Sequence, residues 1–284
     1  MGVKEETGQV EYHYGFYGAV HAVYEPTQIK MEYMQEHELG EEPVRMDMLL
    51  IKQESRSLKD PIGSFFKMHN VLEYKSPDDK LNIDTFFKAL GYALLYKGLG
   101  KTIDEISLDE LTVSLFRHRY PREMFEALQK YGMAHEEIHP GVYRIMGPIC
   151  VPVQVVIASR LPDDEYEEFK ILAQNAKKKD VLKVLDKLSC DQGMADYISA
   201  VLRVSLAVNK ELFKEIEEEG KMTEVVKEIF SKELDERQHE TEEKIILKML
   251  KKKEPIDKIG EYTEVPMERI IAIAKSAGLG AVAV

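Results

Sequence analysis

Two short apolar runs in the N-terminal part of the chain carry charged residues where a plain core strand would have none. Residues 46–51 include Asp47, and residues 71–79 include Glu73 and Lys75. Side chains alternate between the two faces of an extended strand, so Glu73 and Lys75 are expected to point the same way. Burial of both runs would bring Asp47, Glu73 and Lys75 into one pocket with little water.

Such a pocket would have a specific chemistry. A lone carboxylate without water is costly, whereas two carboxylates that share a divalent cation, with an ammonium group beside them, are satisfied. Asp47 and Glu73 are therefore the predicted metal ligands, and Lys75 is the predicted neighbouring positive charge. A Glu-x-Lys tripeptide is also common by chance, and acids near strand ends often pair with lysine simply to solvate an edge.

The elements that must position these residues alternate between helix and strand. Hydrophobic periodicity and the places of proline and glycine predict an α/β fold, with the strand at 151–158 in the centre of its sheet. On the helix opened by Asn82 or Asp84, a stripe with Lys88, Tyr92 and Tyr96 lies beside the predicted buried one and is expected to face the strand ends. Its predicted buried stripe is Phe86, Phe87, Leu90 and Leu94. The predicted helices are 9–25, 82–98 and 121–131, and the predicted strands are 28–38, 46–52, 71–75, 111–118, 142–146 and 151–158.

From residue 163 onward the sequence predicts helix almost without interruption. The charged segment 210–253, which Gly220 interrupts, suits a solvent-exposed or self-associating helix, so a homodimer through it is one expectation. The tail resembles a small helix-turn-helix with Pro266 at the first position of its second helix; that helix offers only Arg269 and Lys275 to nucleic acid, so packing or protein contact is favoured. The predicted helices before this segment are 163–176, 178–189 and 193–208, and the predicted domains are 1–173, 174–254 and 255–284.

Composition limits the class of protein. The chain has 284 residues, of which 44% are hydrophobic and 32% charged, as in an ordinary globular protein. No apolar run approaches the roughly 18 residues that a membrane span needs, so no membrane partner is expected. The N-terminus lacks the apolar core of a signal peptide. The two cysteines, Cys150 and Cys190, are too few for a disulfide framework and favour a reducing cytoplasm, with Cys150 expected in the core.

The charge pattern bears on nucleic acid as a partner. A formal net charge of -12 argues against broad, non-specific binding, which depends on Lys and Arg. A local basic groove is still possible, and the candidates are Arg117, His118 and Arg119 together with Arg122. The lysine runs 177–179 and 251–253 are interpreted as solvated faces and helix-end charges.

The order of these elements resembles the PD-(D/E)XK nuclease superfamily. After such a core come Tyr120-Pro121-Arg122, Gly141-Val142-Tyr143, a strand, a helical region and a short helix-turn-helix tail, and this layout resembles the transposase-associated, recombination-promoting branch of that superfamily. A helix, a strand, a strand with Asp47, a strand with Glu73-x-Lys75, a helix and a further strand follow one another, as in the α-β-β-β-α-β core of that superfamily. The resemblance covers roughly residues 9–173 and implies a restriction-endonuclease-like core followed by a helical C-terminal region.

This resemblance implies a metal-dependent DNA endonuclease, and the branch implies a link to mobile elements. Asp47 and Glu73 would bind Mg²⁺ or Mn²⁺, with the backbone carbonyl of Tyr74 as a further ligand, and Lys75 would orient the attacking water or stabilise the transition state. Lys88 or Tyr92 would contact the phosphate.

Three features depart from the family pattern, and one of them is the negative overall charge. Many members add an acid from the first helix, but here the sequence offers only Glu11 and Glu25, and neither is assigned. Asp47 is also not preceded by proline. The alternative hypothesis is therefore a catalytically inactive relative that serves as a binding or scaffolding module through residues 210–253.

Overall fold

The computed structural model describes residues 12–35, 38–39, 44–190, 192–222, 226–227, 231, 242–252, 254–263 and 265–277. Contacts divide the chain into a larger unit, Val10–Thr223, and a smaller one that contains Glu224–Val284. The first predicted domain boundary, at residue 173, lies within the larger unit, and the second, at residue 254, lies within the smaller one. None of the helices that the structure describes has an apolar stretch long enough to cross a membrane.

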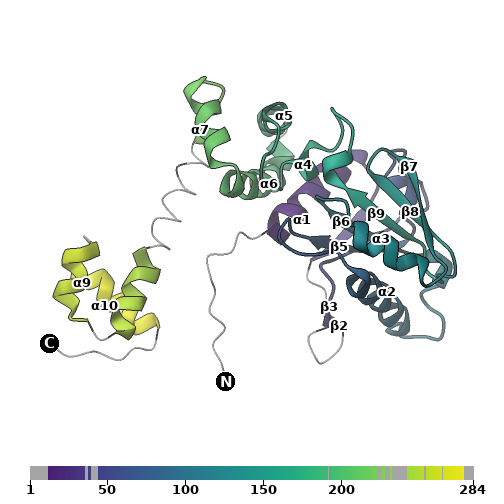
Figure 1. Ribbon diagram of the computed structural model, residues 1–284, viewed down its shortest axis with the longest axis horizontal. Helices are drawn as coiled ribbons and strands as arrows, with labels where there is room; N and C mark the ends of the chain where they lie inside the picture. The colour runs from purple at the N-terminus through teal and green to yellow at the C-terminus, as the bar shows by residue number, and fades with distance from the viewer. Residues whose placement is uncertain are drawn as a thin grey trace. The chain divides into compact units, whose positions relative to one another are not determined.

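The larger unit is an α/β structure built on a mixed sheet of seven strands (Figure 1). The strand order is β1-β4-β5-β6-β9-β8-β7, in which β5, β6 and β9 are parallel neighbours and the other pairs are antiparallel. The strands are β1 (Met31–Gln35), β4 (Met48–Lys52), β5 (His69–Lys75), β6 (Leu111–Arg117), β7 (Ala134–His139), β8 (Val142–Met146) and β9 (Val153–Ile157), and β2 (Glu38–Leu39) pairs separately with β3 (Val44–Arg45).

Helices cover both faces of this sheet. On one face, α1 (Tyr12–Tyr24) places the ring of Phe16 against that of Tyr74 on β5, with 4.8 Å between the ring centroids. On the other face, α2 (Ile83–Gly98) and α3 (Arg122–Gln129) contribute Phe86 and Phe125 to a core shared with Val113 of β6 and other strand residues. Asn82 caps α2, because its side chain accepts a hydrogen bond from the backbone N–H of Thr85.

The remaining helices of the larger unit extend from the α1 side. After the short α4 (Glu167–Lys170) come α5 (Lys178–Cys190), α6 (Ala195–Val208) and α7 (Lys210–Glu218). A Cβ at position 15 would clash with Val204, and a Cβ at position 18 would clash with the carbonyl oxygen of Tyr197. The glycines at these two positions therefore allow α1 to pack closely on α6. The short 3-10 helices are η1 (Glu25–Thr27), η2 (Gly63–Phe65), η3 (Leu108–Glu110), η4 (Ala158–Arg160) and η5 (Gln192–Met194).

The smaller unit has an apolar cluster of its own. Residues 242–251 are helical, and α9 (Ile256–Thr263) and α10 (Met267–Ser276) follow. Ile246, Ile259 and Ile270 are fully buried in this cluster. The two successive helices expected in the tail are present, but Pro266 is the N-cap of α10 instead of its first helical position.

Several predicted elements differ from the structure. The polar strand β7 was not predicted, and the predicted helix at 163–176 is reduced to α4. On α2, Phe87 and Leu94 are exposed, whereas Tyr92 and Tyr96 are buried, so the buried stripe is rotated from the predicted one. Gly220 has a φ of +68°, just after the end of α7, which confirms the predicted interruption; much of 221–253 lies outside the described residues.

Candidate functional site

Asp47 and Glu73 lie opposite each other at the ends of neighbouring strands. In the antiparallel pair of β4 and β5, Met48 is the partner of Leu72, so the next positions along the two chains are Asp47 and Glu73. Asp47 was predicted inside the strand but occupies a bend immediately before β4. A hydrogen bond of 2.8 Å from the backbone N–H of Tyr74 to Asp47 Oδ2 holds the carboxylate against β5.

Glu73 and Lys75 point to the same face of β5, as the alternation of strand side chains predicts. Lys75 Nζ donates a hydrogen bond of 2.8 Å to Glu73 Oε1. The Glu73 side chain is only 4% exposed and that of Lys75 is 21% exposed. The second carboxylate oxygen of Glu73, Oε2, is buried and accepts no hydrogen bond from the residues that the structure describes. One acceptor of this buried acid is thus left for another group.

The electrostatics of the site follow from this packing. Burial raises the pKa of Glu73, and the nearby charge of Asp47 raises it further, against the opposing effect of Lys75 and Lys88. Burial lowers the pKa of Lys75, but the carboxylates of Glu73 and Asp47 outweigh this and raise it overall. A buried carboxylate whose charge is disfavoured by burial and by a neighbouring carboxylate is a favourable environment for a cation.

The residues present fit a hard divalent cation. Asp47 and Glu73 supply carboxylate oxygens, the ligand type that Mg²⁺ and Mn²⁺ prefer. Within the described ranges no three His, Cys, Asp or Glu side chains are grouped so that they could hold a metal ion together. Proteins usually hold Mg²⁺ through one or two carboxylates, while water and substrate phosphate complete the coordination.

The first helix contributes a histidine to this site. His13 Nε2 lies 3.5 Å from Asp47 Oδ1, and the His13 ring meets the ring of Tyr74 edge-on. Of the two acids considered from the sequence, Glu11 lies outside the described residues, and Glu25 follows the far end of α1, beside His21. Sequence reasoning missed His13. Its signal was the spacing to the buried Phe16, three residues later on the same side of the helix.

Lys88 and Tyr92 of α2 have different environments. Lys88 is exposed, lies close enough to oppose the rise in the pKa of Glu73, and has its Nζ 5.3 Å from the centroid of the Tyr92 ring. Tyr92 is only 5% exposed. Lys88 is therefore the better placed of the two to meet a ligand from solvent.

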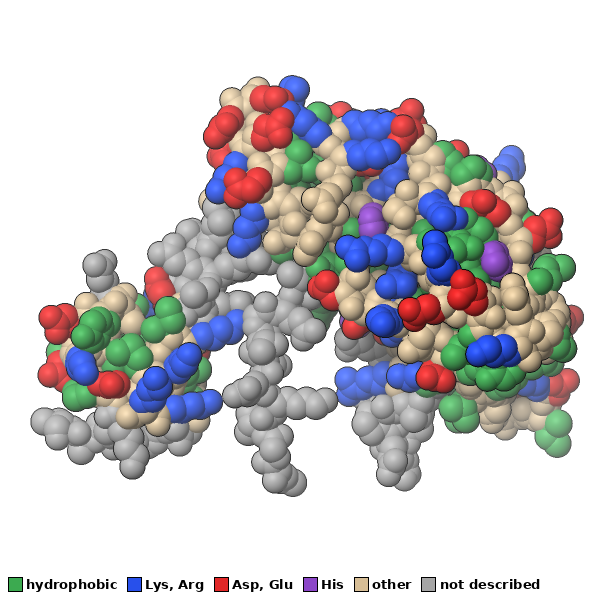
Figure 2. All heavy atoms as spheres, in the orientation of Figure 1, with side chains coloured by type: hydrophobic (Ala, Val, Ile, Leu, Met, Phe, Trp, Pro, Cys, Tyr) green, Lys and Arg blue, Asp and Glu red, His purple; other side chains and the backbone are tan. Residues whose placement is uncertain are grey.

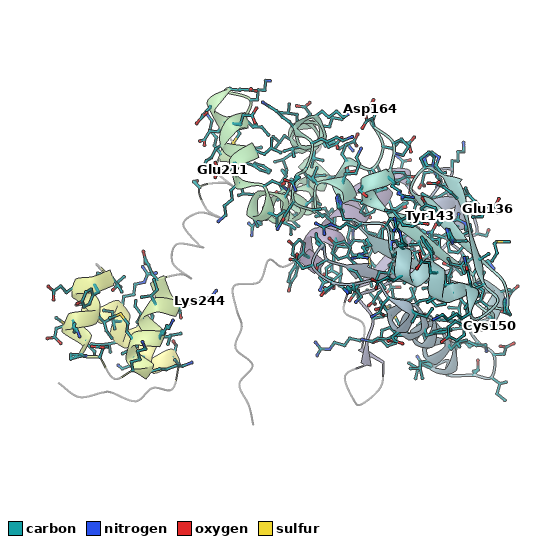
Figure 3. All side chains as sticks on the ribbon, viewed as in Figure 1. Glu136, Tyr143, Cys150, Asp164, Glu211 and Lys244 are labelled. Atoms are coloured by element: carbon teal, nitrogen blue, oxygen red, sulfur yellow. The ribbon has the colours of Figure 1, made fainter. Side chains whose placement is uncertain are left out.

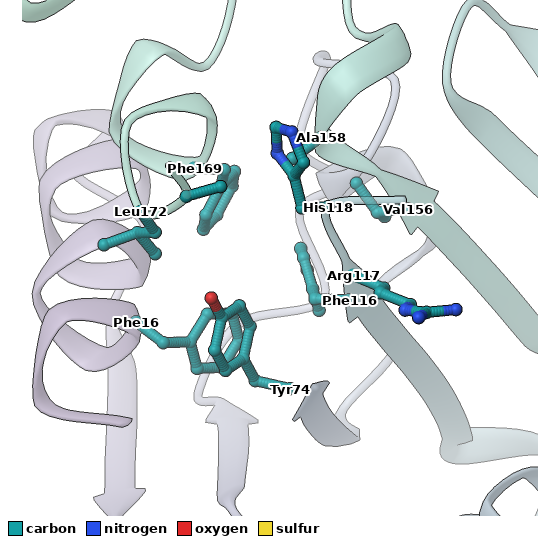
Figure 4. Close-up of a pocket in the computed structure, with 10 residues that line it drawn as sticks. Phe16, Tyr74, Phe116, Arg117, His118, Val156, Ala158, Phe169 and Leu172 are labelled. Carbon is teal, nitrogen blue, oxygen red and sulfur yellow. The ribbon is translucent and has the colours of Figure 1, made fainter. Parts of the chain in front are cut away.

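Two other features lie apart from the carboxylates. A narrow hollow on the α1 face is lined by the rings of Phe16, Tyr74, Phe116 and Phe169, and Figure 4 shows the Arg117 side chain directed away from it. The thiol-bearing Cys150 was expected in the core but is exposed (Figure 3).

Comparisons with known proteins identify no relative of this chain: no family model, curated protein or solved structure matches it.

Proposed function

We propose that this chain is a metal-dependent nuclease that hydrolyses phosphodiester bonds in DNA, with a core of the PD-(D/E)XK, restriction-endonuclease-like type. One observation carries this proposal: Asp47, Glu73 and Lys75 converge across β4 and β5, and a buried oxygen of Glu73 remains without a partner.

The order of the elements supports the same proposal. The elements of the core come in the order α1, β1, β4, β5, α2 and β6. The strands β1, β4 and β5 form an antiparallel meander, and β6 pairs with β5 in parallel. This is the α-β-β-β-α-β order to which the sequence bears a resemblance. The meander places the end of β5 beside the start of β4, which is why acids separated by 26 residues (73 − 47) meet.

Each residue has a distinct role in the proposed reaction. Asp47 and Glu73 would hold a Mg²⁺ or Mn²⁺ ion, whose chemistry would be to lower the pKa of a bound water and to neutralise charge on the phosphate. The Tyr74 N–H keeps Asp47 in place, and His13 contacts its other oxygen. Glu73 holds the ammonium of Lys75 in the site, where a fixed positive charge stabilises the negative charge that develops on the attacked phosphate.

The test is cleavage of supercoiled plasmid DNA with Mg²⁺ or Mn²⁺. The native chain should nick or linearise the plasmid, and EDTA should abolish this. Asp47→Asn and Lys75→Ala should each reduce the rate by about 100-fold or more, the usual effect of removing one group that stabilises the transition state. Lys214→Ala, an exposed change on α7, is the matched control and should leave the rate unchanged.

Two outcomes would contradict the proposal. Equal cleavage by the native chain and by Lys75→Ala would identify a contaminating nuclease. Absence of cleavage with either ion would favour the alternative, an inactive binding module.

A further inference from the structure

A row of arginines begins next to Lys75 and continues onto α3. Lys75 at the end of β5 is in register with Arg117 at the end of β6, and residues paired in adjacent strands point to the same face. Burial lowers the pKa of Arg117, and the nearby Arg119 lowers it further, while Glu123 and Asp79 act in the opposite direction. Arg117 Nε is buried without a hydrogen-bond partner among the described residues.

The next two arginines have free guanidinium groups. Arg119 and Arg122 are exposed, and no hydrogen bond or ion pair engages either side chain within the part of the chain that the structure describes. Other exposed cations in the larger unit are paired: Lys177 contacts Asp163 at 3.0 Å, and Lys214 contacts Glu211 at 3.1 Å.

The surface view shows the same contrast. In Figure 2, Lys and Arg side chains gather over α3 and the strands next to it, although the whole chain has a formal net charge of -12. Neighbouring cations repel one another, and where they have no partner within the protein an anion that binds to them relieves this repulsion. Arginine in particular presents a planar set of donors that matches phosphate oxygens.

We propose that Arg117, Arg119 and Arg122, here called the β6–α3 arginines, bind the phosphodiester backbone of a nucleic acid and lead it to the carboxylates of the site. This inference rests on the proposed function for the identity of the ligand. It adds the side from which the nucleic acid approaches the site: its phosphodiester backbone passes along the end of β6 and the start of α3, next to Lys75.

Binding is tested separately from cleavage. A fluorescein-labelled DNA duplex, and an RNA duplex of the same sequence, are titrated with the full chain in EDTA, and anisotropy gives Kd at several salt concentrations. The variant Arg119→Ala/Arg122→Ala removes two exposed charges. The control Lys210→Ala/Lys214→Ala removes two exposed charges from α7, so the net charge changes equally.

We expect the arginine variant to bind the preferred duplex about tenfold more weakly at 0.1 M salt, and its plot of log Kd against log salt to be less steep by about 1.8, or 0.9 for each lost phosphate contact. The control should match the native chain. Circular dichroism should show unchanged melting, since both arginines are exposed. The tighter duplex identifies the nucleic acid.

Equal affinity of the native chain and the arginine variant, or an equal loss in the lysine control, would overturn the inference while leaving the proposed function intact. Weaker binding by the arginine variant together with no plasmid cleavage by the native chain would overturn the proposed function and support the inference.

Discussion

Glu73 is the residue at which the proposed function and the stability of the fold oppose each other. Its pKa in the folded chain lies above the ordinary value of 4.5, so the folded state binds this proton more tightly than the unfolded state does. The free energy of unfolding that this group contributes is therefore present at low pH and is lost as pH rises from about 4.5 through the higher folded pKa. At neutral pH the charge of Glu73 is a net cost to the fold.

We therefore expect Glu73→Gln, which resembles the protonated acid, to stabilise the chain at pH 7 by about 1 kcal/mol, or 2–4 °C in melting temperature. The gain should disappear near pH 4. Thermal melting between pH 4 and 8 measures it, with the exposed Glu126→Gln as control. Equal or lower stability of Glu73→Gln at pH 7 would show that the ion pair with Lys75 outweighs burial.

His13 is expected to position Asp47. A partner that orients a metal ligand typically contributes about 10–100-fold to metal affinity. His13→Ala should therefore weaken Mn²⁺ binding about tenfold in isothermal titration, and His13→Gln, which keeps a hydrogen-bonding group, should weaken it less. The same affinity in all three chains would remove His13 from the site.

For single residues of the site, the sequence predicted correctly the features that depend on local backbone geometry. Glu73 and Lys75 share a face because strand side chains alternate, and this is confirmed by their hydrogen bond. Asp47 was misplaced into a strand because residues 46–51 are uniformly apolar around it, whereas the structure bends there. The approach of His13 depends on how α1 docks on the sheet, which no local pattern contains.

At the scale of helices and strands, the packing of α1 against α6 depends on their close approach at Gly18. A Cβ at this position would meet the backbone carbonyl oxygen of Tyr197, which cannot move aside as a side chain can. Gly18→Ala should therefore destabilise the chain by about 1–3 kcal/mol, as overpacking does. Gly91→Ala on α2 is the matched control: nothing lies within 4 Å of its Cβ.

Because alanine favours helix over glycine, Gly91→Ala should stabilise by about 0.5–1 kcal/mol. Urea unfolding of both variants gives the two values. The same sign of change in both would mean that helix propensity, and not the contact with α6, decides the effect at Gly18.

Two differences between the sequence predictions and the structure each have a physical cause. β7 contains Ala-His-Glu-Glu-Ile-His, which has no alternation, and it needs none because this edge strand is largely exposed. The extent and N-cap of α2 and the burial of Phe86 and Leu90 were predicted correctly, but Phe87 and Leu94 are exposed and Tyr92 and Tyr96 are buried in their place. Tyr96 turns inward because its hydroxyl pairs with His69 Nδ1 at 3.0 Å, so a polar group on the buried face is satisfied.

For the whole molecule, the division into two units determines which parts are needed for the proposed reaction. α1, β4, β5, α3 and α6 all belong to Val10–Thr223. The buried Ile246, Ile259 and Ile270 form a separate cluster in the smaller unit. The proposed homodimer, in contrast, depends on residues 210–253, which extend across the boundary between the units.

A chain shortened to residues 10–223 should therefore keep the main thermal transition within a few degrees of the full chain and keep metal-dependent plasmid cleavage, because it loses no part of the sheet or of its helical cover. Differential scanning calorimetry and the plasmid assay measure both. Sedimentation equilibrium of the two chains adds the association state: if residues 210–253 hold a dimer, the full chain sediments as a dimer and the shortened chain as a monomer. Loss of the main transition on shortening would mean that the smaller unit stabilises the fold, and the site would then have to be understood as a product of the entire chain.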